Sequence, residues 1–204
     1  MMMDFILCCV PNANRLRWDD VIRKAAKDAS GRHLIVIDGV SISQCELDRI
    51  GKLHGITRQK VMFTLLCLAK YKNVARPNNN GWINFDASFI FKTANTSLTS
   101  RAGMLLLHEL AQLEYISYSR RVDSLSLQID MIDDAEDPVA TITDFRNLGN
   151  QYLRLIGHTD FIECAECGAV VRRNGRRQRY CKACAREVNQ RKQLWRNRTA
   201  AFGA

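Results

Sequence analysis

Two pairs of cysteines near the C-terminus have the spacing of a metal site. Cys164 and Cys167 are separated by two residues, and Cys181 and Cys184 repeat this spacing after thirteen intervening residues. Two residues between thiolates let one tight turn present both sulfurs to a tetrahedral Zn²⁺, and two such pairs complete a site with no open position. The pattern predicts one structural zinc ion held by these four cysteines.

Other uses of these thiols fit the sequence less well. A redox dithiol needs one pair in a thioredoxin-like setting, and a catalytic zinc needs an open coordination position that four sulfurs would fill. The remaining cysteines (Cys8, Cys9, Cys45, Cys67) lie in apolar surroundings and are predicted to be core residues. Because no Ser/His/Asp set, glycine-rich phosphate loop or His-x-Glu pairing is present, we expect no enzyme activity.

The residues around the cysteines predict the local fold of the site. Gly168 follows the second cysteine, where a knuckle turns backbone N–H groups toward the sulfur. Residues 169–171 and 178–180 are predicted to pair as a hairpin about the turn Asn174-Gly175, and a helix is expected from Cys181 to about Arg198. Knuckle, hairpin and helix in this order resemble the treble-clef and ribbon-type zinc fingers.

All of the excess charge of the chain lies in the same segment. Residues 164–204 hold eleven basic and two acidic residues, a net charge of +9 that equals the net charge of the whole chain. Such asymmetry predicts a polyanion-binding surface, with nucleic acid as the partner, DNA favoured and RNA open. Arginine dominates, which suits bidentate contacts with phosphate and guanine. The candidate contacts are Arg172, Arg173, Arg176, Arg177, Arg179, Lys182, Arg186, Arg191, Lys192, Arg196 and Arg198.

Two apolar residues of the predicted basic helix are seven positions apart. Val188 and Trp195 therefore lie on one face of that helix. We expect this face to pack against the rest of the protein, with base stacking by Trp195 as the alternative.

The middle of the chain has the element order of a winged helix. Apolar periodicity and turn residues predict a helix opened by a Ser43/Glu46 capping box and ending at Gly55, a helix from Thr57 to Tyr71, a strand over 82–85, a short helix from Asp86 to Lys92, a helix over 98–113 and a hairpin of 114–119 with 124–132. The 98–113 helix is expected to bury Leu98, Ala102, Leu105, Leu106 and Leu110.

This resemblance to winged helices rests on element order alone, and it implies a site. Thr99, Ser100 and Arg101 would begin the recognition helix, and Arg120 with Arg121 would lie at the tip of the wing. Residues 86–132 carry four basic and five acidic residues. Phosphate neutralisation supplies most non-specific affinity for DNA, so DNA reading and protein docking both stay open for this module.

The predicted fold class is α+β, a mainly helical body with a hairpin and a small four-cysteine module. Its predicted parts are an N-terminal segment over 1–42, a winged-helix-like domain over 43–134, an acidic hinge and connecting helix over 135–160, and the zinc module over 161–204. Within the N-terminal segment, strands at 5–10 and 33–40 are predicted to flank a helix over 17–29. No apolar run is long enough for a signal peptide or a membrane span, so a cytoplasmic protein without a membrane partner is expected.

The run Thr143-Asp144-Phe145-Arg146-Asn147-Leu148-Gly149, the two cysteine pairs and residues 186–192 together resemble small proteins of phages and prophages of Gram-positive bacteria. The resemblance covers about residues 43–198 and implies a winged-helix-like body followed by a basic zinc finger. It implies an accessory or regulatory protein that binds nucleic acid, in a host bacterial cell. The alternative is an inhibitor or adaptor docking on a host nucleoprotein complex, such as a polymerase or an RNA-guided nuclease; the oligomeric state stays open.

Overall fold

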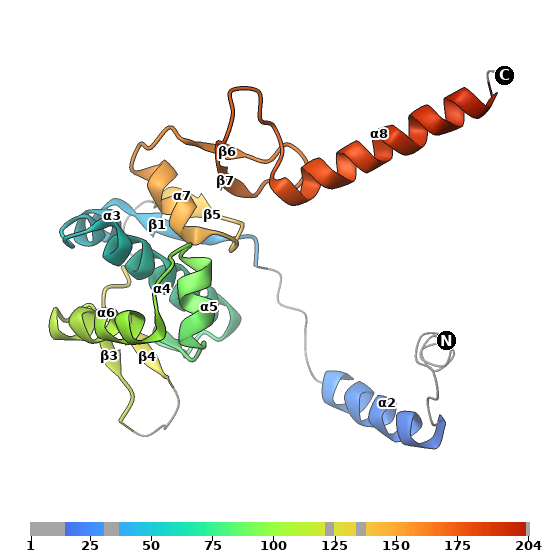
Figure 1. Cartoon of the computed structure of the whole chain (residues 1–204). Coiled ribbons are helices and arrows are strands. Elements are labelled where there is room, and N and C mark those ends of the chain that lie inside the picture. The colour runs from blue at the N-terminus through green and yellow to red at the C-terminus, as the bar shows by residue number, and fades with distance from the viewer. Residues whose placement is uncertain (1–14, 31–36, 121–124, 134–137, 203–204) are drawn as a thin grey trace. The chain divides into compact units, whose positions relative to one another are not determined.

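The computed structural model describes residues 15–30, 37–120, 125–133 and 138–202 (Figure 1). The chain divides into two units, residues 1–36 and residues 37–204. In the first unit, α2 (Arg15–Ser30) is the helix that the sequence predicted over 17–29. The strand expected over 5–10 lies outside the described residues, as does most of the one expected over 33–40.

The second unit is built around one helix that is buried on every side. In α4 (Ile56–Ala75), all ten residues from Val61 to Lys70 are buried. A helix that is apolar all round must be surrounded by other elements. Four helices pack on it: α3 (Gln44–Gly51), α5 (Ala87–Thr93), α6 (Ser100–Gln112) and α7 (Leu148–Leu155).

The boundary between α3 and α4 differs from the predicted one. α3 ends at Gly51 rather than at Gly55, and Gly55, not Thr57, is the N-cap of α4. Gly55 has a φ of 92°, which a residue with a Cβ rarely adopts. The tight connection between the two helices therefore requires glycine at the cap, and Thr57 lies within the first turn.

Three small antiparallel sheets accompany the helices, and this confirms the α+β class. The first pairs β1 (Val40–Ser43) with β5 (Pro138–Ile142). The second has the order β2–β4–β3, from the strands Trp82–Ile83, Leu127–Ile129 and Ile116–Tyr118. The predicted antiparallel pairing of residues 114–119 with 124–132 is thus present. Arg121, which was predicted to lie at the tip of the wing, is outside the described part. The third sheet belongs to the cysteine-containing segment.

The body extends across both boundaries predicted for the winged-helix-like domain. Val40 and Ile142 are paired across β1 and β5, and both belong to the same hydrophobic core as Leu148 and Tyr152 of α7. The segment predicted as a hinge and connecting helix therefore closes the body. Tyr152 packs against Phe63 of α4 with the rings tilted and their centroids 5.3 Å apart, which fixes α7 on the central helix.

A buried ion pair holds the first sheet to the helices. Glu46 of α3 is fully buried and lies 2.8 Å from the Nζ atom of Lys70 in α4. The other carboxylate contacts come from the backbone N–H groups of Ser43 and Asp133, and Lys70 also donates to the carbonyl of Ser41. The Ser43/Glu46 capping box is present as predicted. Each charge is satisfied several times, which is the condition for burying an ion pair.

The phase of α6 differs in part from the prediction: Leu106 and Leu110 are buried as expected and Leu98 is half-buried, but two other residues are not. Its buried residues are Gly103, Leu106, Leu107 and Leu110, whereas Ala102 is exposed and Leu105 is 59% exposed. A Cβ atom on Gly103 would lie 2.3 Å from the Phe91 ring, so the helix approaches α5 along its glycine. This contact turns Leu105 outward. Along the described parts of the chain, no helix combines the length and apolar character needed to cross a membrane.

Candidate metal centre and basic surface

The first cysteine pair lies in the turn of a short hairpin. β6 (Phe161–Glu163) pairs with β7 (Val170–Arg172), and Cys164 and Cys167 lie between them. The predicted hairpin of 169–171 with 178–180 is wrong, because β7 takes the preceding segment as its partner and residues 173–181 form an irregular loop. Phe161 and Ile162 supply an apolar strand that the sequence analysis missed. The short connection through the cysteines brings this strand beside β7.

The second pair lies at the start of the last helix. α8 (Lys182–Phe202) begins directly after Cys181, and Cys184 lies in its first turn. The helix that the sequence predicted from the second pair to about Arg198 is therefore present.

The fold brings the four sulfurs together. All four lie within 4.8 Å of one another, and the Sγ atoms of Cys167 and Cys181 are 3.9 Å apart. The four thiols are free, and Cys164 and Cys184 are buried. This group could hold a metal ion, as the spacing predicted. Cys67, by contrast, is buried in the body, where burial raises the pKa of its thiol and makes it an unreactive core residue.

Backbone N–H groups converge on these sulfurs. Cys181 donates its N–H to the sulfur of Cys164 at 3.2 Å, and Cys184 donates to the sulfur of Cys181 at 3.4 Å. Gly168 has a φ of 71° and donates its N–H to the carbonyl of Cys164 at 2.8 Å. The left-handed conformation favours glycine, as the sequence predicted for this turn, but the N–H of Gly168 reaches a carbonyl and not a sulfur.

The sulfurs do not ionise independently. Burial alone raises the pKa of the Cys164 thiol, but the N–H groups of Cys181, Cys167 and Glu166 outweigh burial and lower that pKa to about 6. Hydrogen bonding with the sulfurs of Cys181 and Cys167 raises the pKa of Cys184. Without a metal, the site therefore favours the ionisation of one thiol and opposes the ionisation of a second. A bound cation would supply the charge that lets all four ionise.

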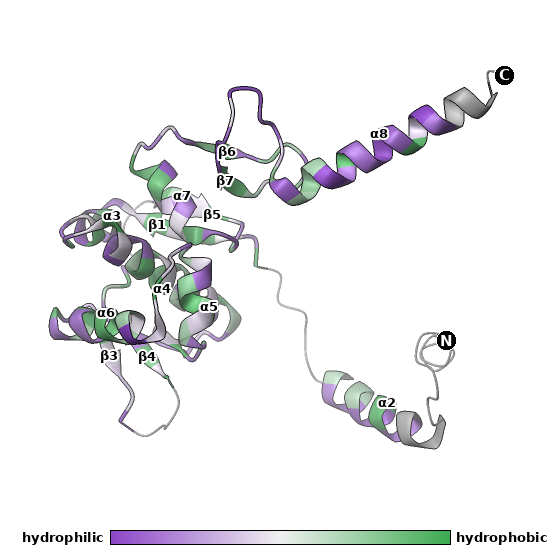
Figure 2. Cartoon of the chain, viewed as in Figure 1, coloured by the Kyte–Doolittle hydropathy of each residue, from purple (hydrophilic) through white to green (hydrophobic). Residues whose placement is uncertain are grey.

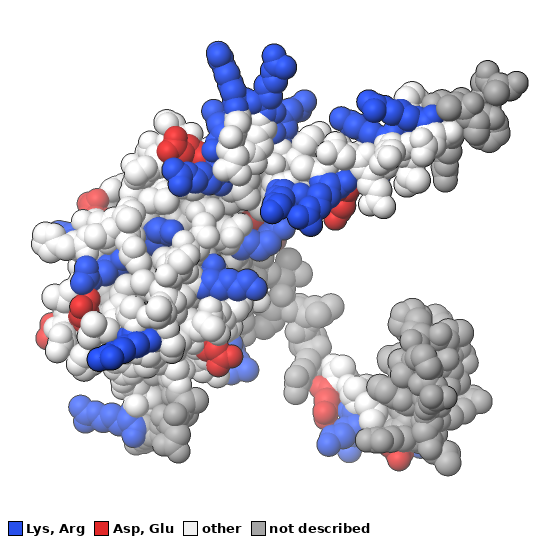
Figure 3. All heavy atoms as spheres, viewed as in Figure 1, with Lys and Arg blue, Asp and Glu red and all other residues white. Residues whose placement is uncertain are grey.

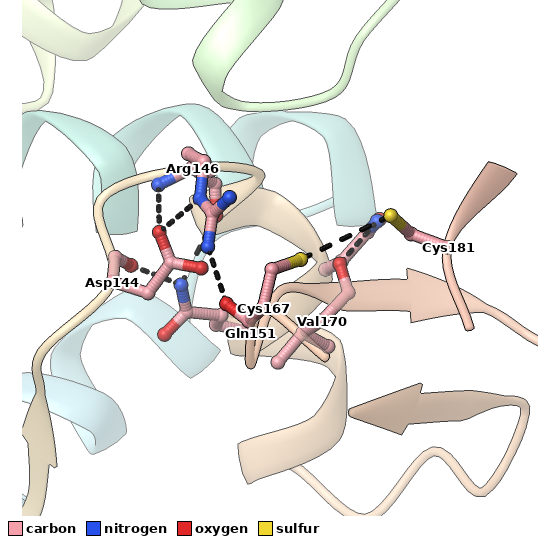
Figure 4. Close-up of polar contacts among 7 residues, drawn as sticks. Asp144, Arg146, Gln151, Cys167, Val170 and Cys181 are labelled. Carbon is pink, nitrogen blue, oxygen red and sulfur yellow. Dashed lines mark hydrogen bonds and ion pairs between the residues drawn. The ribbon is translucent and has the colours of Figure 1, made fainter. Parts of the chain in front are cut away.

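The body supports the knuckle through one guanidinium group (Figure 4). Arg146 precedes α7 and donates to the backbone carbonyl of Cys167 at 2.7 Å. Its Nε and its backbone N–H both donate to Oδ1 of Asp144, each at 2.9 Å. Gln151 of α7 donates to the backbone carbonyls of Asp144 and Arg146. The guanidinium is thus oriented before it reaches the cysteine turn.

A second connection runs through two asparagines. Asn95, in the turn between α5 and α6, donates to the side-chain carbonyl of Asn150 at 2.6 Å, and Asn150 donates to the carbonyl of Val170 in β7 at 3.5 Å. The close approach depends on Gly149, because a Cβ atom there would lie 1.9 Å from the carbonyl oxygen of Ala94. α7 thus contacts both the central helix α4 and β7 of the cysteine segment.

Sequence reasoning did not assign a role to these supporting residues. Asp144, Arg146 and Gln151 have no spacing that marks them as supports of a metal site. Their function depends on a contact with Cys167, which lies 21 residues after Arg146 in the chain. The only available signal was the resemblance that included residues 143–149.

Basic side chains gather over the loop after β7 and along α8 (Figure 3). The predicted contacts of the loop and of the described part of α8 are all exposed. Arg191 pairs with Glu166 beside the metal centre. Eight further basic residues form no salt bridge with any carboxylate among the described residues. They are Arg172, Arg173, Arg176, Arg177, Arg179, Lys182, Arg186 and Lys192. The side chain of Arg198 lies outside the described part.

The apolar face expected on this helix is only partly buried. Val188 is 9% exposed and packs beside Cys184, whereas Trp195 is 68% exposed. Every residue from 189 to 197 is exposed, and Figure 2 shows α8 as hydrophilic along most of its length. The prediction that this face is buried as far as Trp195 is therefore wrong, since burial ends at Val188.

The candidates in the body lie on other elements. Thr99 is the N-cap of α6 and accepts a hydrogen bond from the N–H of Ala102. Ser100 and Arg101 follow in the first turn and are exposed, and Arg120 is exposed after β3. These residues are not part of the loop and helix that carry the unpaired cations.

No known protein family, curated protein or solved structure matches this chain.

Proposed function

We propose that the protein binds nucleic acid, with DNA as the favoured ligand, through the basic surface that its metal centre orders. The observation that carries the proposal is the group of eight exposed cations without a carboxylate partner among the described residues. Like charges held close together on a small scaffold repel one another, and a polyanion relieves that repulsion. The guanidinium groups match phosphate oxygens in a bidentate manner.

We infer that the ion is zinc and that its role is structural. A tetrahedral ion with bonds of about 2.3 Å to sulfur places its ligand atoms about 3.8 Å apart. The Cys167 and Cys181 sulfurs are 3.9 Å apart. Four thiolates leave no position for a substrate or a water molecule, so the ion would order the arginine loop and the start of α8 rather than take part in a reaction.

Salt dependence tests the proposal directly. Binding of the zinc-loaded full chain to a random-sequence DNA duplex would be measured by fluorescence anisotropy over a range of salt concentrations. Each phosphate contact contributes about 0.9 to the slope of log affinity against log salt. We expect the double substitution Arg176→Gln/Arg177→Gln to weaken binding and make the slope shallower by about one to two.

The matched control removes the same charge from the body. Lys52 and Lys92 are exposed, and Lys52→Gln/Lys92→Gln should leave the slope unchanged. Chelation of the metal, or Cys181→Ser, should abolish binding. Equal slopes for the loop variant and the native chain, or full binding without metal, would contradict the proposal.

We propose a second function for the winged-helix-like module of the body, which is to dock on a protein partner. The outward side of α6 carries Met104 and Leu105, which are 43% and 59% exposed. Leu105 also lines a groove of about 280 Å³ together with Leu98 and Leu106. Exposed apolar side chains next to a groove fit a protein partner better than a phosphate backbone.

Nuclease treatment separates this role from nucleic-acid binding. A partner that docks on α6 should stay bound to the full chain after nuclease digestion of a host lysate, and Leu105→Glu should release it. Loss of every partner on digestion would leave nucleic acid as the only ligand and would contradict the docking role.

A further inference from the structure

One side of α8 carries five polar side chains in a regular series. They follow one another at intervals of four, three, four and three residues: Lys182, Arg186, Asn189, Gln193 and Arg196. With about 3.6 residues per turn, these intervals place all five on one face of the helix. Each of the five is exposed. We call this set the reading face.

The chemistry of the reading face is that of side chains that distinguish base pairs. Arginine and lysine donate to the O6 and N7 atoms of guanine, and asparagine and glutamine form paired hydrogen bonds with the N6 and N7 atoms of adenine. The series spans about 21 Å of helix at about 1.5 Å per residue. A B-DNA major groove admits an α-helix, so a run of this length can meet several successive base pairs.

The buried residues of α8 lie on another side of the helix. The side that packs on the module carries Cys184 and Val188, both buried. Glu187 is the only acidic residue of the helix and lies about 140° around the helix from Lys182. Arg191 is also off the reading face and is held by Glu166. No carboxylate of the helix would therefore face the phosphates that flank a bound groove.

The helix that a winged helix would use has a different surface. The outward side of α6 includes Arg101, Met104, Leu105 and His108, and two of these are apolar. It has one arginine and no asparagine or glutamine before Gln112. The composition expected of a base-reading helix is therefore found in α8 and not in α6.

We propose that the reading face of α8 lies in the major groove of duplex DNA and selects its sequence, while the arginines of residues 172–179 hold the flanking phosphates. This inference rests on the proposed nucleic-acid binding and names its ligand. Duplex RNA does not fit, since its major groove is too deep and narrow for a helix to read. Phosphate contacts position the module, and the reading face supplies the choice of sequence.

The test is selection from a library of random DNA duplexes with the zinc-loaded full chain. We expect a short consensus that contains guanine and adenine. The affinity ratio between the selected duplex and a shuffled one is then measured at one salt concentration. Asn189→Ala/Gln193→Ala should lower that ratio by roughly five- to a hundredfold and leave the salt slope unchanged, because amides read bases without neutralising phosphates.

A matched control exists on the same helix. Gln190 and Asn197 are also exposed amides seven residues apart, and they lie about 70° from the centre of the reading face, beyond its edge at Arg186. Gln190→Ala/Asn197→Ala should keep the native ratio, as should Arg101→Ala in α6. Circular dichroism would check that each variant keeps its helices.

Each outcome separates the inference from the function on which it rests. Failure to bind any nucleic acid would overturn both. Salt-dependent binding without a consensus would leave the proposed function in place and overturn the reading face. A consensus unaffected by Asn189→Ala/Gln193→Ala, or tighter binding to duplex RNA of the same sequence, would also overturn it.

Discussion

Arg146 shows how a single side chain connects two parts of the molecule. Its guanidinium is oriented by Asp144 and ends on the carbonyl of Cys167, one of the four candidate metal ligands. Groups that hydrogen-bond to a ligand residue fix the position of its donor atom, and they contribute to metal affinity without touching the metal. Arg146 lies in the body of the protein, but its side chain contacts the candidate metal centre.

We therefore expect Arg146→Ala to lower metal affinity by about 10- to 100-fold, because the knuckle loses the guanidinium contact that comes from the body. The measurement is competition with a chromophoric chelator. Arg154→Ala is the control, since Arg154 forms an exposed pair with Glu163 on the neighbouring strand. Equal affinities for the two variants would show that the Arg146 contact does not support the site.

At the scale of elements, α7 is the piece that joins the body to the cysteine segment. It packs on α4 through Tyr152 and reaches β7 through Asn150. Gly149 lets the helix lie directly against the carbonyl of Ala94, where a side chain has no space. The position of α7 therefore depends on the absence of one methyl group.

Gly149→Ala should lower the free energy of unfolding of the body by about 1–3 kcal/mol, because the new Cβ forces α7 away from Ala94. Gly51→Ala is the matched control. Nothing lies within 4 Å of a Cβ atom at Gly51, and its φ is not positive. That substitution should stabilise the protein by about 0.5 kcal/mol through the unfolded chain.

Urea denaturation followed by circular dichroism would measure both changes. Opposite signs for the two glycines are the expected result. Equal effects would mean that the close approach of α7 is not under the steric constraint described above.

At the scale of the whole molecule, two parts of the second unit are held together by different forces. The body has a continuous core around α4. The segment after Asp160 buries few residues among those described: Cys164, Ala169, Val170, Cys184 and Val188. We therefore expect this segment to need a bound metal to fold and the body to fold without one.

Removal of the metal should therefore unfold the C-terminal segment and leave the body folded. Limited trypsin digestion would then cut rapidly after the arginines of residues 172–198, while a fragment ending near residue 156 would persist. Added zinc should restore protection. Unfolding of the body at the same chelator concentration, or unchanged protection of the loop arginines, would contradict this division.

Much of this architecture could be predicted from the sequence because it depends on local spacing. Two Cys-x-x-Cys pairs allow few arrangements other than a shared metal site, and the Ser43/Glu46 capping box acts within one helical turn. The charge of the last segment needs no fold to be counted. The helix order and the antiparallel pair of the body followed from apolar periodicity and turn residues.

Only the tertiary structure decided the features that depend on contacts distant in sequence. The pairing of β1 with β5, the phase of α6 set by Gly103, the pairing of β7 with β6 and the contact of Arg146 with Cys167 each join segments that local patterns treat separately. Periodicity shows that a helix has an apolar side, but the packing partner decides which residues it buries. The sequence alone determined which chemistry is present, and packing determined which side chains present it to solvent.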